Sequence, residues 1–125
     1  MIKRINAILI IFVLFLTACS VTSGKFHNIK LSDNSTIQDA NAIVRTILQS
    51  QLETKTIKEF PNWNPQKHIM YVRASNVMDT DNPSNTGIYI TVGVKCNLKN
   101  IDEILNYLKS EVEKEINRYF KNQDL

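Results

Sequence analysis

The chain has 125 residues, with 15 lysines and arginines against 12 aspartates and glutamates, and its formal net charge is +3. A chain of this length forms at most one domain of ordinary size. The excess of positive charge is small, and no basic patch with interleaved aromatic residues accompanies it, so we expect no nucleic-acid partner.

Residues 1–18 have the pattern of an export signal. Lys3 and Arg4 precede an almost unbroken apolar run that ends at Leu16, and such positive charges favour the cytoplasmic side of a membrane. The run is too short for a hydrocarbon core of roughly 30 Å, which needs about 20 apolar residues. Its length is that of a signal-peptide core, roughly 7–15 residues. The pattern predicts a leader that is removed from the mature protein.

The end of this leader resembles the lipobox of bacterial lipoproteins, and the residues that carry the resemblance are Leu16, Thr17, Ala18 and Cys19. In that family the cysteine carries a diacylglyceryl thioether, the leader is cut before it, and the new amino group is acylated in many bacteria. The resemblance implies that Cys19 is an S-diacylglycerol and N-acyl cysteine that holds the protein in membrane lipid. Two or three acyl chains anchor firmly, at about 0.8 kcal/mol for each buried methylene.

The location follows from the same resemblance. Ser20, in place of aspartate after the cysteine, is similar to the pattern of Gram-negative lipoproteins sorted to the outer membrane. We therefore expect a membrane-anchored protein, facing the periplasm from the outer membrane if the source is Gram-negative. The alternatives are an ordinary secretory signal with an incidental cysteine and an uncleaved anchor, which the short apolar run disfavours.

Cleavage before Cys19 changes what the composition means. It leaves 107 of the 125 residues and a formal charge of about +1, because Lys3 and Arg4 leave with the leader. Cys96 is then the only cysteine besides the lipidated one, so the sequence predicts no intramolecular disulfide. Cys96 is interpreted as a reactive thiol, an intermolecular link or a small buried hydrophobe on a strand.

The first half of the mature chain predicts a tether, a possible strand and a helix. Residues 20–25 are short and polar and are interpreted as a flexible tether, and residues 26–31 as a possible short strand. Ser35 and Gln38 fit a capping box. The helix that follows runs to about residue 53, or towards residue 59, before Pro61 stops it. Its apolar stripe comprises Ile37, Ala40, Val44, Ile47, Leu48 and Leu52.

The second half predicts two strands and a long helix. Residues 88–96 alternate between apolar and polar types with a period of two, and residues 68–78 do so less regularly. The inward face of the earlier strand comprises Met70, Val72 and Ala74, with Met78 as a further candidate, and Tyr71, Arg73 and Ser75 lie opposite. The connection over residues 79–87 is rich in turn residues. Asn100 then caps a helix with acidic residues in its first turn.

The resulting order, (β)-α-β-β-α, predicts a small two-layer α+β domain with two amphipathic helices on an antiparallel hairpin or three-stranded sheet. The domain occupies residues 32–125, after residues 19–31 with the lipidated cysteine, the tether and the possible strand. Two strands alone are marginally stable. Either the early segment adds a third strand, or an open edge pairs with a partner chain.

The candidate sites for metal or catalytic chemistry are weak. Asp79 and Asp81 resemble the start of a calcium loop, but Pro83 takes the next ligand position and no glutamate closes the loop. His27 and His68 lack metal-ligand spacing. No nucleophile elbow or glycine-rich phosphate loop is present. We therefore expect that the protein is not an enzyme and that it binds no metal and no cofactor.

Trp63 and Tyr71 are the candidate binding residues, because tryptophan and tyrosine are enriched in binding hot spots. Trp63 lies between two prolines on a loop, and the alternative is that it folds back to cap the core. Gly93 interrupts the clearest strand and predicts a bulge or the close approach of another backbone.

The sequence pattern is compatible with two functions. The first is a non-enzymatic accessory lipoprotein that binds another protein of the cell envelope. The second is a small-ligand-binding or inhibitor lipoprotein that uses the aromatic loop around Trp63.

Overall fold

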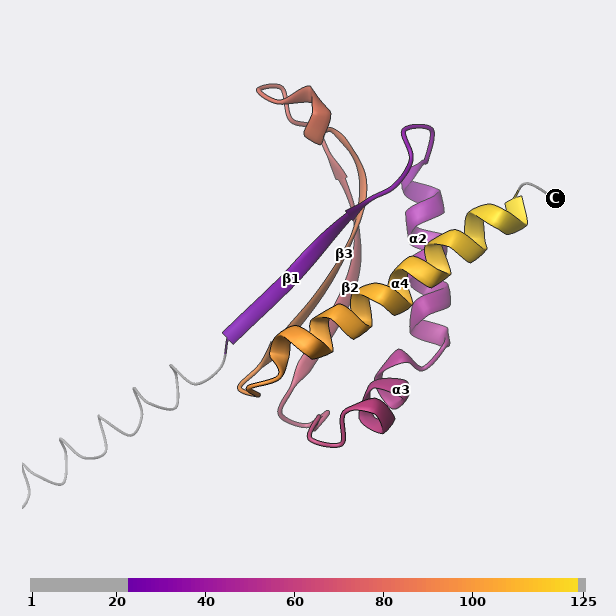
Figure 1. Ribbon diagram of the computed structural model, residues 1–125. Coiled ribbons are helices and arrows are strands. Elements are labelled where there is room, and N and C mark those ends of the chain that lie inside the picture. The colour runs from indigo at the N-terminus through magenta and orange to yellow at the C-terminus, as the bar shows by residue number, and fades with distance from the viewer. Residues whose placement is uncertain (1–22, 124–125) are drawn as a thin grey trace, which may run out of the picture.

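The computed structural model describes residues 23–123 (Figure 1). Cys19 and the predicted leader lie outside this part of the chain. The elements, in order, are β1 (Ser23–Lys30), α2 (Ile37–Gln49), α3 (Leu52–Glu59), β2 (Ile69–Val77), the short 3₁₀ helix η1 (Pro83–Asn85), β3 (Gly87–Cys96) and α4 (Ile101–Gln123). The predicted small α+β domain is confirmed.

The three strands form one antiparallel sheet in the order β1-β3-β2. The hairpin of β2 and β3 is confirmed, and the possible early strand is present as a third strand on the other side of β3. β1 begins at Ser23, which pairs with Cys96. The predicted tether through Lys25 is therefore too long, because the chain enters the sheet at Ser23, three residues before the predicted start of the strand at residue 26.

The helices cover one face of this sheet, and Figure 1 shows α2 and α4 on the same side of it. Alternation along β3 sends Val92 and Val94 to this face, where both are fully buried. The apolar stripe of α4 packs on them. The largest fully buried side chains include Ile43, Ile47, Ile90, Val92, Val94, Ile104, Leu108 and Val112.

The helix that the sequence predicts up to residue 53 is two helices. Gln51 has φ 58° and ψ 48°, in the left-handed region, and it separates α2 from α3. The change of direction lets α3 bury Leu52 and Thr56, and the Thr56 hydroxyl donates to the Leu52 carbonyl at 2.8 Å. α3 ends at Glu59 with Phe60 as its C-cap, so Pro61 lies just beyond the helix, as the sequence predicts.

The start of α2 is held by a hydrogen-bonded network. The capping box uses Thr36 and Asp39, not Ser35 and Gln38: the Asp39 amide donates to Thr36 Oγ1 at 3.2 Å and the Thr36 amide donates to Asp39 Oδ2 at 2.9 Å. The Tyr119 hydroxyl of α4 donates to Asp39 Oδ1 at 2.7 Å. One carboxylate therefore caps α2 and ties it to the far end of α4.

Candidate functional site

Trp63 lies inside the core. Trp63 is 3% exposed, and its ring packs on the imidazole of His68, with the two ring centroids 5.1 Å apart. The Asn64 amide donates to His68 Nδ1 at 2.9 Å, and His68 Nε2 lies 3.2 Å from Asn97 Oδ1. These contacts fold the loop back onto the end of β3. A ligand would reach the indole only after the loop moved, so the small-ligand hypothesis lacks the surface residue on which it was based.

Tyr71 lies on the outer face of the sheet, away from the helices. Its ring covers Gly93, since a Cβ built at that glycine would lie 2.2 Å from Tyr71 Cζ. The Arg73 guanidinium carbon lies 4.5 Å from the centroid of the same ring. The pairing of Gly93 with Phe26 and Tyr71 is continuous, without a bulge. The close approach predicted at Gly93 is therefore made by a side chain rather than by another backbone.

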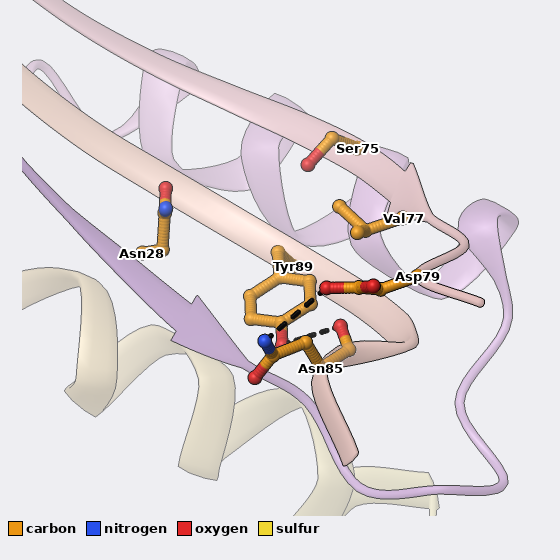
Figure 2. Close-up of a pocket in the computed structure, with 6 residues that line it drawn as sticks. All are labelled: Asn28, Ser75, Val77, Asp79, Asn85 and Tyr89. Carbon is orange, nitrogen blue, oxygen red and sulfur yellow. Dashed lines mark hydrogen bonds between the residues drawn. The ribbon is translucent and has the colours of Figure 1, made fainter. Parts of the chain in front are cut away.

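A polar hollow of about 390 Å³ opens where the turn after β2 folds over the sheet (Figure 2). Its lining comprises Asn28, Ser75, Val77, Asp79, Asn85 and Tyr89. Asp79 accepts hydrogen bonds from the amides of Asp81 and Asn82 and from Asn85 Nδ2, and the Tyr89 hydroxyl donates to the Asn85 carbonyl. The amide of Asn82 is the main cause that lowers the pKa of the Asp79 carboxyl. This carboxylate organises its own turn, which favours a structural role.

A second, more apolar hollow of about 270 Å³ runs beside β2. Its apolar walls come from the α2–α3 junction and the first half of β2, and include Ile47, Leu48, Leu52, Met70 and Val72. We call this surface the β2 groove. β2 is an edge of the three-stranded sheet, so its outward backbone groups have no neighbouring strand within residues 23–123. An apolar channel therefore runs along an open strand edge.

Sequence reasoning did not find this groove. The sequence pattern predicts that Leu48 belongs to the apolar stripe of the first helix, but this residue is 65% exposed, so that prediction is wrong. Ile47 takes the inward position and is 1% exposed. The side chain of the next residue, Leu48, therefore points outward beside the sheet edge. Met78, considered for the inward face of β2, is 83% exposed, because the strand ends at Val77.

Comparisons with protein-family models, with curated proteins and with solved structures found no significant match to this chain. Between residues 23 and 123, no helix is both long enough and apolar enough to cross a bilayer. The same part of the chain contains no group of three or more histidine, cysteine, aspartate or glutamate side chains placed to hold a metal ion.

Proposed function

We propose that this protein is a lipid-anchored component of the bacterial envelope that binds an extended segment of another envelope protein along β2. The observation that carries the proposal is the β2 groove, an apolar channel beside an open strand edge. The anchor is supported by the lipobox pattern that ends at Cys19. The role is non-enzymatic, since binding at this edge requires no catalytic group.

The geometry indicates what the bound segment looks like. A strand added to β2 lies about 4.8 Å from it, and its side chains alternate between the two faces. Those on the helix side meet Leu48 and Leu52, so they should be apolar. Those on the outer side meet Tyr71 and the exposed Arg73, which favours aromatic or acidic residues. Main-chain hydrogen bonds supply affinity in this mode, while the groove selects side chains.

The test is crosslinking of the full-length, lipidated protein in cells, followed by recovery and identification of what is attached. Leu48→Asp places a charge in the groove, whereas Met78→Asp makes the same change at an exposed apolar residue outside it. We expect the first variant to lose the crosslinked partner and the second to keep it. Equal recovery with both variants, at unchanged thermal stability, would contradict binding in the groove.

The anchoring component has a separate readout. Intact-mass measurement of the membrane-extracted protein should show the loss of residues 1–18 and the added mass of acyl chains. Cys19→Ala should abolish both changes. A protein that keeps its leader, or loses it without gaining acyl mass, would contradict the lipoprotein assignment.

A further inference from the structure

The short distance between the proposed lipid attachment and the sheet restricts how the domain can sit on a membrane. Three residues separate Cys19 from Ser23, the first residue of β1. A chain extends by at most about 3.6 Å for each residue, so the two Cα atoms lie no more than about 14 Å apart. The end of the sheet where β1 begins is therefore close to the lipid surface whenever Cys19 is acylated.

The antiparallel order determines which residues share that end. Ser23 pairs with Cys96, and Lys95, one residue earlier on β3, pairs with Ile69 at the start of β2. The turn over residues 79–86 lies at the opposite end. At about 3.4 Å for each residue, Ile69 and Met78 are roughly 30 Å apart.

The two ends differ in charge. Lys67, Lys95 and Lys99 are exposed near the start of β1, and none of them belongs to an ion pair among the described residues. Lys25, at the same end, is paired with Asp102 at 2.7 Å, and Glu103 is exposed beside that aspartate.

The opposite turn has a different character. It contains Asp79 and Asp81 and no lysine or arginine between residues 78 and 86. Lys30 reaches it from β1, and its ammonium donates to the Ser84 carbonyl at 2.7 Å.

From this asymmetry and the short connection we infer that the end of the domain formed by Lys67, Ile69, Lys95 and Lys99 rests on the membrane and contacts anionic phospholipid headgroups. We call these four residues the membrane-facing end; the inference rests on the proposed acylation of Cys19. Lysines near an anionic surface are attracted to it, and the aspartates of the opposite turn are repelled. Ile69 is 56% exposed beside Lys95 and can enter the interfacial layer. Met78 is more exposed still, so exposure alone does not distinguish the ends, whereas charge and the connection to Cys19 do.

The experiment uses the full-length, lipidated protein in vesicles of phosphatidylcholine with or without phosphatidylglycerol. A fluorophore is attached through Ile69→Cys or, in a second preparation, through Met78→Cys, and a quencher is placed in the bilayer. Cys96 is 1% exposed, and labelling of the parent protein measures its background. With phosphatidylglycerol present, we expect quenching at position 69 to exceed quenching at position 78 several-fold.

Charge-matched variants identify the cause. Replacing Lys67, Lys95 and Lys99 with glutamine should reduce the difference between the two labels to the value in phosphatidylcholine alone. The same replacement at Lys109, Lys114 and Lys121 on α4 should leave it unchanged. Each lysine near the surface contributes about fivefold to association with anionic lipid, so the three together have a measurable effect.

The outcomes separate this inference from the proposed function. Acylated protein with equal quenching at both positions overturns the orientation, and a difference that does not depend on the three lysines overturns the contact with anionic headgroups; both results leave the lipid anchor intact. Protein without acyl mass on Cys19 overturns both. Stronger quenching at position 78 would show that the opposite end faces the membrane.

Discussion

The network of Thr36, Asp39 and Tyr119 leads to a quantitative prediction about stability. Asp39→Ala removes the reciprocal cap of α2, which typically costs about 1 kcal/mol, and also leaves the Tyr119 hydroxyl without its acceptor. We expect a total loss of about 1–2 kcal/mol in the free energy of unfolding. Tyr119→Phe removes only the bond between the helices and should cost about 0.5–1.5 kcal/mol.

The double variant should lose less than the sum of the two single losses, because both remove the same hydrogen bond. A coupling energy of about 0.5–1 kcal/mol is expected for residues in one network. Urea unfolding followed by circular dichroism measures the three losses, and a loss of 1 kcal/mol lowers Tm by about 4–8 °C in a domain of this size. Asp33→Ala, at an exposed residue in the connection between β1 and α2, should change stability by no more than about 0.5 kcal/mol.

The pH dependence gives a second check on the same carboxylate. Hydrogen bonds from the Thr36 amide and then from the Tyr119 hydroxyl lower the pKa of Asp39 in the folded protein. Its stabilisation is therefore complete above the unfolded value of about 3.9 and is lost as pH falls through the lower folded value. The difference between wild type and Asp39→Ala should be full at pH 6 and shrink below about pH 4. Additive losses at pH 7, or a constant difference down to pH 2, would refute the network.

Three further predictions concern the core and the outer face of the sheet. Trp63 is the single tryptophan, and its burial predicts blue-shifted emission with weak acrylamide quenching; strong quenching in the folded protein would contradict its position. Leu108→Ala should cost about 2–5 kcal/mol in chemical unfolding, whereas Leu48→Ala should cost no more than about 0.5 kcal/mol; equal losses would be inconsistent with their burial. Gly93→Ala should displace the Tyr71 ring, which would be visible as altered chemical shifts of that ring. Unchanged shifts would argue against the contact between the Tyr71 ring and Gly93.

The sequence predicts some strands well and others poorly, for physical reasons that differ between them. β3 is the central strand, and its residues at every second position are buried, so its period of two is clear. β1 is an edge strand whose helix-facing side includes Lys25, and that lysine reaches out to Asp102. A charged residue on the inward face obscures the alternation, which is why the sequence pattern predicts a tether where this strand begins.

The break between α2 and α3 and the groove beside it had no local signal. Gln51 adopts a left-handed conformation that glycine and asparagine favour. A glutamine at this position is therefore no signal for the end of a helix. One side of β2 is open because β1 pairs with β3 and not with β2. This long-range pairing is not specified by the hydrophobic pattern of either strand. The groove therefore follows from strand order and helix direction together.

The central position of β3 also determines when the sheet can exist. Both edge strands come earlier in the chain and pair with β3, not with each other. A chain that is synthesised from its N-terminus first presents β1 and then β2 before their common pairing partner. Closing β1 on β3 joins residues as distant as Ser23 and Cys96, and such non-local contacts form slowly. A chain that stops before residue 87 would thus expose two strands with unpaired edges, a template for aggregation, whereas one that stops after residue 123 retains every strand.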